Sequence, residues 1–367
     1  MDDALFFEAF DGHTAFGGAE TTLDRLLRGE SALAATPVVP EGQAEAVPLA
    51  AATPLALTTP PRWWPLLSDL VADIPGEGWG TRGRPVFLAG SNFGIDRLYE
   101  MGRGSAPDAQ ADSWATVHGI VRHLRDRFGW GPLIQPVSHA CVSAQVALSL
   151  AAEWMEAGAA EKALVLSFDY IGPFVSAGFH SLKILNAGFP GPYEDRAIGS
   201  IGLGDGAAWA VLSRKPSPWR LVARSSWNEM HHFTANEAGG SGFRAVLEPL
   251  SPHLGGRPLW IKGHGTGTLE AGRLEATAVA ARFPGAPLVS WKGGLGHTLG
   301  SCALVELVLA ARGHERGRLP GTVGTRGPTF TPEVATEPFA PPARSDILLL
   351  CNAFGGAHGA LLLRHEN

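Results

Sequence analysis

One cysteine and two histidines stand in segments that suit acyl transfer through a covalent thioester. Cys141 follows Ser138-His139-Ala140 and comes directly before a long run of helix-forming residues. His264 lies in Gly263-His264-Gly265-Thr266-Gly267-Thr268, and His297 ends Lys292-Gly293-Gly294-Leu295-Gly296-His297. A thiol that can ionise attacks a thioester carbonyl, and imidazoles on tight turns can serve the same reaction. The three residues are therefore candidates for one active site.

The position of Cys141 favours a reactive thiol. A loop-to-helix junction directs free backbone N–H groups and the positive end of the helix dipole at its first residues. This placement lowers the pKa of a thiol and favours the thiolate near neutral pH. The alternative is that Cys141 is a small buried hydrophobic residue, which is the more common role of an isolated cysteine. On this segment alone both interpretations stay open.

The two histidines sit on glycine-rich turns that can present an imidazole to a pocket. Small neighbours let a substrate approach His264 closely, and His297 has the same surroundings with Lys292 five residues earlier. The alternative is that each histidine only completes a local hydrogen-bond pattern. Neither segment has the ligand spacing of a metal site, so zinc is not expected.

Composition and charge exclude several classes of function. Hydrophobic residues make up 45% of the 367-residue chain and charged residues 17%, which is ordinary for a folded protein. The net charge is −6 and no basic stripe is present, so nucleic acid is not expected as a main partner. The longest apolar region, residues 31–60, is interrupted by prolines and cannot form a membrane-spanning helix.

The cysteines and the first residues predict a cytoplasmic protein. Cys141, Cys302 and Cys351 have neither metal-ligand spacing nor a paired framework, which suits a reducing compartment. The segment Met1-Asp2-Asp3-Ala4 lacks the basic region of a signal peptide.

Strands and helices alternate along most of the chain. Strands are expected at residues 5–10, 85–90, 132–137, 163–168, 207–212, 259–262, 287–290, 347–352 and 359–363. Helices are expected at 22–27, 111–128, 142–157, 176–185, 242–250, 270–281 and 299–312. The Ala- and Pro-rich stretch from about 31 to 64 has no clear period and is expected to cross the surface. This alternation indicates α/β layers on mostly parallel sheets. We expect two similar halves, 1–217 with the nucleophile and 218–367 with the histidines, each with its own sheet.

Six segments, in order over nearly the whole chain, resemble the β-ketoacyl-acyl carrier protein synthases, the decarboxylating condensing enzymes of the thiolase superfamily. The segments are Gly12–Gly17 with the following Leu23–Ser31, Ala140–Ser143, Leu203–Ala208, His264–Thr268 with Glu275, Lys292–Gly300, and Phe354–Gly359. Each segment is weak alone, but six in register are specific. The resemblance implies the thiolase-like fold, in which two similar α/β halves form an α-β-α-β-α body.

The resemblance also implies roles for individual residues. Cys141 would attack an acyl thioester and hold the acyl group, while a malonyl-type extender loses carbon dioxide and attacks it as an enolate. His264 and His297 would donate hydrogen bonds to the extender oxygen, and Lys292 would order His297 or assist decarboxylation. The supporting residues are Glu275, Thr266, Thr268, Phe354 and Gly355, with the backbone N–H groups of Cys141 and of Phe354 or a neighbour binding the acyl oxyanion.

The resemblance implies that no cofactor or metal is needed. It also implies the partners of this chain. They are an acidic acyl carrier protein, acyl and malonyl thioesters, and either a second copy of the chain or a related ketosynthase-like subunit. Arg122, Arg125 and Arg127 are candidates for the carrier-binding patch, although a solvated helix face is the favoured explanation, because exposed helix faces are usually charged. The pathway would be fatty acid, polyene or polyketide synthesis, and the acyl tunnel would draw on Phe174, Phe179, Met230, Phe233 and Trp291.

Three departures from the family pattern keep two alternatives open. Gly272 stands where the family has an acidic residue. The closing loop is about two residues shorter than the family's common form, so its phenylalanine gate is absent or replaced. The chain is also compact for a member that stands alone. A non-catalytic partner similar to the chain-length factors is one alternative. A non-decarboxylating thiolase with Cys351 as its base is the other, but thiolases lack the His-Gly-Thr-Gly-Thr segment and the lysine before the second histidine.

Overall fold

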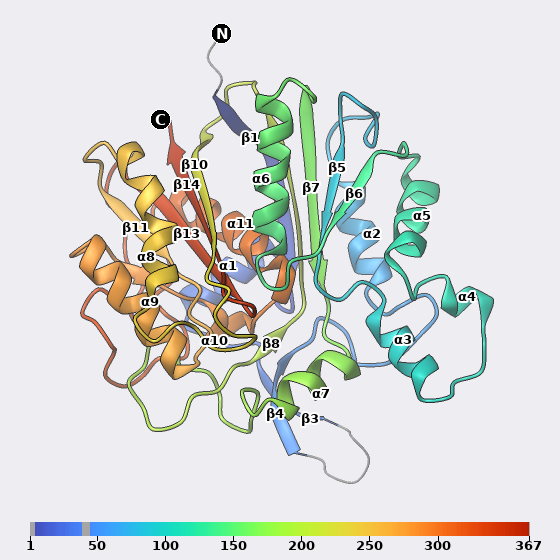
Figure 1. Ribbon diagram of the computed structural model, residues 1–367, viewed down its shortest axis with the longest axis horizontal. Helices are drawn as coiled ribbons and strands as arrows, with labels where there is room; N and C mark the ends of the chain where they lie inside the picture. Colours follow the sequence, from blue (N-terminus) through green and yellow to red (C-terminus); the bar gives the residue numbers. More distant parts are fainter. Residues whose placement is uncertain (1–3, 39–44, 367) are drawn as a thin grey trace.

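The computed structural model describes residues 4–38 and 45–366, and one large sheet runs through the molecule (Figure 1). Its strand order is β12-β11-β13-β14-β10-β1-β9-β7-β5-β6, with the short β2 (Gly17–Gly18) beside β1. The bounds are β1 Leu5–Thr14, β5 Val86–Ala89, β6 Ile134–Val137, β7 Lys162–Asp169, β9 Gly206–Ser213, β10 Trp219–Asn228, β11 Leu259–Lys262, β12 Leu288–Val289, β13 Asp346–Ala353 and β14 Ala357–His365.

The sheet consists of two series of strands with the same order and directions. In the first, β1, β9 and β7 are antiparallel neighbours, and β5 and β6 continue parallel to β7. In the second, β10, β14 and β13 are antiparallel, and β11 and β12 continue parallel to β13. Pairing of Leu5 with Leu221 and of Phe6 with Arg220 joins the two series. The two halves were expected to have separate sheets, but this pairing makes one continuous sheet of them. The division of the chain after residue 217 falls between β9 and β10 and stays a prediction.

Two helices form a layer between the two series. Helix α6 (Ser143–Glu156) packs on β5 and β7 and also reaches β14, whereas α11 (Cys302–Glu315) packs on β1 and β9 and also on β13. Residues 302–311 of α11 are all buried, and so are the alanines of α6. Such burial is expected for helices that form an inner layer.

Further helices cover the outer faces. Helices α2 (Trp64–Ala72) and α5 (Val117–Phe128) pack in one core cluster with the first series, and α8 (Ser241–Leu247) and α9 (Leu269–Arg282) pack with the second. The order of layers is therefore α-β-α-β-α, and the predicted α/β class is confirmed. The expectation of mostly parallel strands is wrong, because the strands from β13 to β7 in the middle of the sheet pair antiparallel and only the outer strands are parallel.

Several predicted elements need correction. The stretch 31–64, expected to be irregular, contains β3 (Ala34–Val38) and β4 (Glu45–Ala50), which form a small sheet with β8 (Leu203–Gly204). The single helix expected at 111–128 is α4 (Ala109–Asp112) followed by α5, because Thr116 caps α5 by accepting the N–H of Gly119. Helices α2 and α3 (Ile95–Gly102) and strand β10 were not predicted.

The remaining elements are short. They are α1 (Ala19–Leu27), α7 (Pro173–Ser181), α10 (Lys292–Leu295) and the 3₁₀ helices Glu248–His253 and Leu299–Ser301. Among the residues described, no helix combines the length and apolar character needed to cross a bilayer. The first three residues, used above to argue against a signal peptide, lie outside the described residues.

Candidate active site

Cys141 lies on a tight turn between β6 and α6. Ala140 has φ 45, an unfavourable value for a residue with a Cβ atom, and the chain enters α6 directly after Val142. The Ser143 hydroxyl fixes the turn, because it accepts the N–H of His139 at 2.8 Å and donates to the carbonyl of Ala140 at 2.6 Å. The turn leaves Cys141 only 8% exposed, at the wall of a cavity of about 410 Å³.

The pKa of Cys141 is raised, not lowered as the sequence predicted. Burial is the main cause, and the neighbouring Cys302 and Asp169 raise the pKa further, while Lys292 opposes them. The desolvation of a buried thiolate therefore outweighs the helix start. Cys141 is therefore a thiol in this site, not a thiolate.

Both predicted histidines line the same cavity. The ring centroids of His264 and His297 are 5.0 Å apart and their planes are nearly perpendicular. Each Nδ1 atom is buried and has no hydrogen-bond partner among the described residues. Burial, followed by nearby cations led by Lys292, lowers the pKa of both rings well below the usual value. Both rings are therefore neutral at pH 7, with one N–H each to offer.

Glu275 holds the turn that carries His264. Its carboxylate accepts the N–H of His264 at 2.7 Å and the N–H of Gly265 at 2.9 Å. The hydroxyl of Tyr193 donates to the same carboxylate at 2.8 Å. Gly272, where the family resemblance predicts an acidic residue, faces Tyr193 and Phe330. Support around His264 therefore comes from Tyr193, which the sequence did not indicate.

A buried carboxylate joins the two histidine turns. Glu306, on α11, lies 2.6 Å from Nζ of Lys292 and 2.8 Å from Nζ of Lys262. Lys262 also donates to the carbonyl of Gly263 at 2.6 Å, next to His264. Desolvation lowers the pKa of Lys262 to about 8. Desolvation acts on Lys292 in the same direction, but the nearby carboxylate of Glu306 outweighs it and the pKa of Lys292 is raised.

Lys292 itself does not line the cavity. Its position supports the predicted ordering of the His297 turn, not a direct contact with substrate. Lys262 and Glu306 were missed from the sequence. Glu306 carried a signal, because it is a single charge inside the apolar run Cys302–Ala311.

The remaining predicted residues divide into two groups. Thr266, Thr268 and Phe354 line the cavity, and the hydroxyls of the two threonines are 3.1 Å apart. Phe354 stacks on Phe179 with the ring centroids 5.6 Å apart. Gly355 is exposed and does not line the cavity; its N–H donates to the carbonyl of Phe233 and is not free to bind an oxyanion.

Asp169 links the nucleophile half to the turn after His297. Its carboxylate accepts the N–H groups of Ser91, Asn92 and Gly300. Burial raises the pKa of Asp169 to about 7. Asp169 was missed from the sequence, because it is the last residue of β7 and no motif surrounds it.

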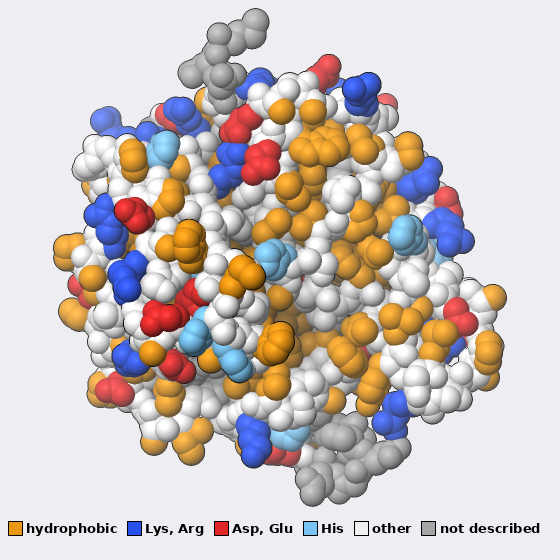
Figure 2. Space-filling view, viewed as in Figure 1, with side chains coloured by type: hydrophobic (Ala, Val, Ile, Leu, Met, Phe, Trp, Pro, Cys, Tyr) orange, Lys and Arg blue, Asp and Glu red, His pale blue; other side chains and the backbone are white. Residues whose placement is uncertain are grey.

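The expected arginine patch does not adjoin the cavity. Arg122, Arg125 and Arg127 lie on α5, in the outer layer at the far edge of the molecule, and none of them lines the cavity (Figure 1). Lys183 is the basic side chain in the lining. Of the residues suggested for an acyl tunnel, Phe179 lines the cavity and Trp291 is in the core. Phe174, Met230 and Phe233 are exposed and do not line the cavity. The face in Figure 2 is hollowed near its centre, between hydrophobic side chains.

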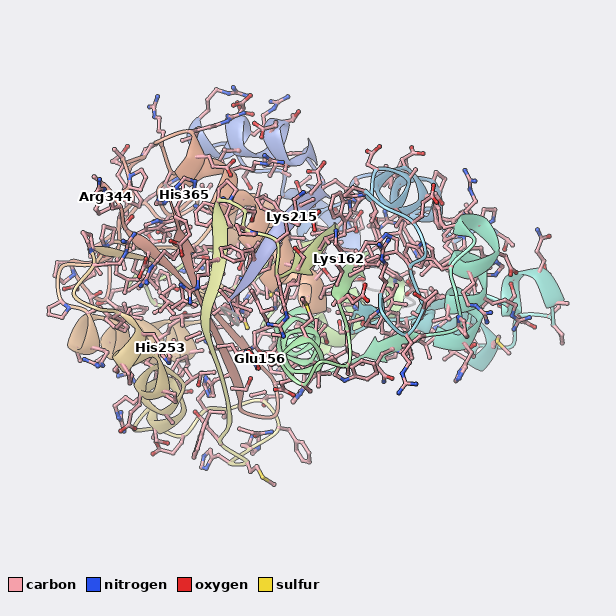
Figure 3. All side chains as sticks on the ribbon, turned by 90° about the horizontal axis from the view of Figure 1, so that it is seen from above. Glu156, Lys162, Lys215, His253, Arg344 and His365 are labelled. Atoms are coloured by element: carbon pink, nitrogen blue, oxygen red, sulfur yellow. The ribbon has the colours of Figure 1, made fainter. Side chains whose placement is uncertain are left out.

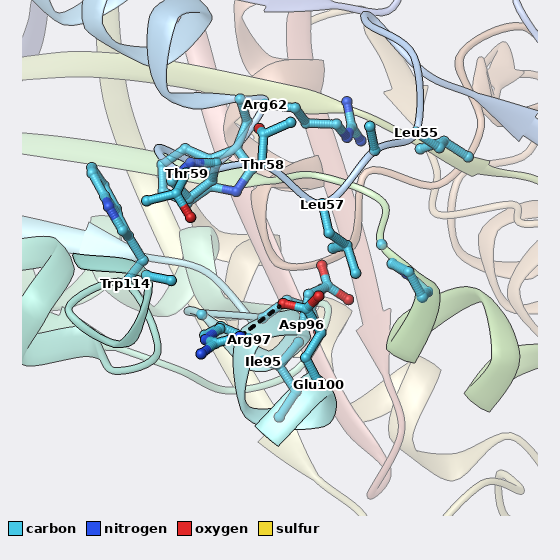
Figure 4. A pocket seen from close by; sticks show the side chains of 18 of the residues that line it. Leu55, Leu57, Thr58, Thr59, Arg62, Ile95, Asp96, Arg97, Glu100 and Trp114 are labelled. Carbon is cyan, nitrogen blue, oxygen red and sulfur yellow. Dashed lines mark ion pairs between the residues drawn. The ribbon is translucent and has the colours of Figure 1, made fainter. Parts of the chain in front are cut away.

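A second cavity of about 220 Å³ contains none of the predicted residues (Figure 4). It lies between the segment 55–63, the loop at 92–97 and the start of α7. Arg62 borders it and makes a two-pronged ion pair with Asp205, at 2.8 Å for each bond. Asp205, from the predicted Gly-Asp-Gly segment, thus has a structural role here.

Within the described ranges, no group of three or more His, Cys, Asp or Glu side chains could hold a metal ion.

Comparisons with known proteins bear on the family. Residues 231–326, which include His264, Lys292, His297 and Glu306, match the model of the β-ketoacyl synthase C-terminal domain. The chain is 27% identical, over 75% of its length, to the tetracenomycin polyketide synthase ketoacyl synthase alpha subunit of Streptomyces glaucescens, covering 72% of that protein. It is 26% identical, over 66% of its length, to a putative polyketide beta-ketoacyl synthase 1 of Streptomyces cyaneus.

The chain spans 63% of the Streptomyces cyaneus protein, and its matches to lovastatin and compactin diketide synthases span 8% of those proteins. Among solved structures, a ketosynthase from Xenorhabdus doucetiae, determined in complex with its chain length factor, covers 99% of this chain and 98% of its own. The TM-score is 0.79 at 20% identity, a likeness of fold.

Proposed function

The chain belongs to the β-ketoacyl synthase family, with relatives among polyketide ketosynthase subunits, and we propose that it is a catalytically active, decarboxylating ketosynthase. The observation that carries the proposal is that Cys141, His264 and His297 line one cavity. The residues for nucleophilic attack and for charge stabilisation thus meet where a thioester can reach both.

In the first step, the sulfur of Cys141 attacks the carbonyl of an acyl thioester on a carrier protein. A bond forms between this sulfur and the acyl carbon, and the bond to the carrier sulfur breaks. Because both histidines have a strongly lowered pKa, they are poor bases at neutral pH. The proton of the buried thiol therefore ends on the departing carrier sulfur.

In the second step, a malonyl thioester loses carbon dioxide and leaves an enolate. The neutral rings of His264 and His297 donate hydrogen bonds to the enolate oxygen, each contributing about 3–4 kcal/mol to its stabilisation. With both Nδ1 atoms buried, Nε2 is the nitrogen that can face the cavity. The enolate carbon then bonds to the acyl carbon, and Cys141 leaves and takes up a proton. The product is a β-ketoacyl thioester.

In this proposal the two histidines are positioned by residues that do not contact the substrate, namely Lys292, Glu306 and Glu275. Glu275 holds the backbone of the His264 turn, and the buried lysines keep both rings neutral by raising the cost of a further positive charge. Thr266 and Thr268 offer hydroxyls to the arm of the carrier-bound substrate at the cavity wall.

A partner subunit is part of the proposal. The related structure from Xenorhabdus doucetiae pairs a ketosynthase with a chain length factor, and another is described as an acyl-carrier protein in complex with its ketosynthase. In this chain, β6 is the edge strand of the sheet, and its neighbour α6 carries Val146, Leu150 and Trp154 partly exposed on one stripe. We propose that a second copy or a related subunit covers this edge, in the cytoplasm.

Two alternatives remain for comparison. A non-catalytic chain-length-factor-like role is disfavoured by the presence of Cys141 and both histidines in the cavity. A thiolase with Cys351 as its base is disfavoured because Cys351 is buried within β13, next to the carbonyl of Gly359, and does not line the cavity.

Intact-protein mass spectrometry after incubation with acyl carrier protein thioesters tests the proposal. We expect one acyl group per chain, located on Cys141 by peptide mapping and lost in Cys141→Ala. A Cys302→Ala variant is the control, because Cys302 is also a buried free cysteine but does not line the cavity. Absence of an adduct on the unmodified protein would support the chain-length-factor role instead.

A further inference from the structure

A row of three polar side chains leads from the protein interior to the cavity. Asn352, near the end of β13, lines the cavity together with Cys141. His358 stands opposite Asn352 on β14, and its Nδ1 lies 2.9 Å from Oδ1 of Asn352. Its Nε2 lies 2.8 Å from Oε1 of Glu229. The side chains of His358 and Glu229 are 0% and 2% exposed, so the row is sealed from solvent at its inner end.

Glu229 also connects two walls of the cavity. Its second carboxylate oxygen accepts the N–H of Glu237 at 2.8 Å, and its own N–H donates to the carbonyl of Gly356 at 2.9 Å. Residues 234–236 and 352–354 line the cavity on either side of these bonds. The carboxylate therefore fixes both the loop after β10 and the β13–β14 hairpin.

The hydrogen-bond chemistry of the row gives Asn352 a direction. Oδ1 of Asn352 is a hydrogen-bond acceptor, so the atom that faces it, Nδ1 of His358, carries the proton of this bond. Nδ1–H then donates to Oδ1 of Asn352, and the amide nitrogen points elsewhere. In the part of the chain that is described, this nitrogen has no hydrogen-bond partner.

We propose that the amide nitrogen of Asn352 donates a hydrogen bond to an oxygen of the bound thioester, and that His358 and Glu229 are positioning residues that hold the amide in this orientation. The inference rests on the proposed ketosynthase function. The oxygen belongs either to the acyl group on Cys141 or to the extender. In the first case kcat/KM for the acyl donor depends on Asn352, and in the second case kcat/KM for the extender does. A site built to hydrogen-bond a substrate oxygen loses specificity when the donor is removed.

Steady-state condensation kinetics, with each substrate varied in turn, test the role of Asn352. We expect Asn352→Ala to lower kcat/KM about five- to tenfold, the loss of one hydrogen bond, for the substrate whose oxygen it binds. An effect confined to the varied acyl donor assigns the acyl oxygen, and one confined to the extender assigns the extender oxygen. Unchanged kcat/KM for both substrates would overturn the proposal.

Variants of Glu229 separate positioning from packing. Gln at 229 can keep its oxygen on the N–H of Glu237 and give its amide hydrogens to His358, so Glu229→Gln retains the orientation of Asn352. Glu229→Ala does not, and we expect it to reproduce the kinetic defect of Asn352→Ala. His365→Gln, at the far end of the same strand, is the control and leaves kcat/KM unchanged (Figure 3). Equal defects in Glu229→Gln and Glu229→Ala would count against the orienting role.

A readout independent of catalysis separates this inference from the proposed function. The ¹⁵N shift of His358 Nδ1 reports whether that atom is protonated and changes in Asn352→Ala when the bond is lost. A protein that forms no β-ketoacyl product refutes the ketosynthase proposal, and with it the substrate contact, whatever the spectrum. An unprotonated Nδ1 in the folded protein overturns the positioning role even if condensation is observed.

Discussion

At the scale of single residues, the candidate site is organised by charges that do not line the cavity. Two lysines share the carboxylate of Glu306, and the turns that carry His264 and His297 are both attached to this cluster. An ion pair with one extra buried cation is costly unless hydrogen bonds surround it. Here the excess charge has a use, because it disfavours protonation of the neighbouring imidazoles.

The first prediction concerns Lys262. Lys262→Met removes one cation and keeps the length of the side chain. The pKa values of His264 and His297 are lowered by burial first, then by Lys292 and also by Lys262, so both rise in the variant. Since the neutral rings are the active form in the proposed mechanism, acid inactivates the enzyme by protonating them. We therefore expect the variant to lose activity at a higher pH than the unmodified protein does. A pH–rate profile from pH 5 to 8 measures the shift.

Lys162→Met is the matched control for that experiment. Lys162 is partly exposed on β7 and pairs with Glu8 at 2.7 Å, away from the cavity (Figure 3). Its profile should overlay that of the unmodified protein. If the pH–rate profile of Lys262→Met also overlays that of the unmodified protein, the charge of Lys262 does not affect the histidines.

A second prediction concerns Tyr193, which supports Glu275. Tyr193→Phe keeps the ring and removes one of the three hydrogen bonds to the carboxylate. We expect the free energy of unfolding to fall by about 1–2 kcal/mol, with a lower kcat and little change in KM, because the His264 turn loosens. Urea denaturation and steady-state kinetics check both. A higher KM with unchanged kcat would place Tyr193 in substrate binding instead.

Residue by residue, the sequence located the groups that carry local signatures. Cys141, His264 and His297 were identified because glycines or a helix start surround them, and the structure brings all three to one cavity. Lys262, Tyr193 and Glu229 could not be found in this way. Their roles depend on contacts with partners 44, 82 and 129 positions away along the chain, which no local pattern records.

At the scale of elements, the turn before α6 is under backbone strain. Ala140 adopts φ 45, which costs a residue with a Cβ atom about 1–2 kcal/mol. We expect Ala140→Gly to raise the free energy of unfolding by about 0.5–1 kcal/mol, after allowance for the greater entropy of the unfolded chain. The more flexible turn should also acylate more slowly. Urea denaturation and the rate of adduct formation measure the two effects, and a destabilised variant would contradict the account of the strain.

Elements were predictable where burial imposes a simple pattern. Strands β7 and β9 and helices α6 and α9 were placed within two residues, because long apolar runs and clear ends define them. Strands β3 and β4 were missed because each contains a proline, Pro37 or Pro48, and proline in a run argues against a strand. Strand β10 was missed because most of its side chains are partly or fully exposed, so no buried alternation marks it.

At the scale of the whole molecule, the two series of strands end differently. Strand β6 is the outer edge of the first series, and Figure 2 shows hydrophobic side chains gathered over the neighbouring region of α6. An unpaired edge beside an apolar stripe favours association, and a stable interface buries about 800 Å² on each partner.

Leu150→Lys tests this surface. Leu150 lies in the middle of the stripe on α6, between Val146 and Trp154. We expect the unmodified chain to sediment as a dimer, alone or with a related subunit, and the variant to sediment as a monomer with unchanged circular dichroism. Arg122→Glu, on the outer helix α5, is the control and should stay dimeric. A variant that remains dimeric would place the interface elsewhere.

The central claim is that Cys141 holds an acyl group that the extender then removes. The most direct measurement is a chase: the protein is loaded with an acyl thioester, freed from excess, and mixed with malonyl-carrier protein while its intact mass is followed. The account predicts that the adduct on Cys141 disappears as carbon dioxide and one β-ketoacyl thioester form in equal amounts, and that His264→Ala retains the adduct. An adduct that persists, or is lost only by hydrolysis, would contradict it.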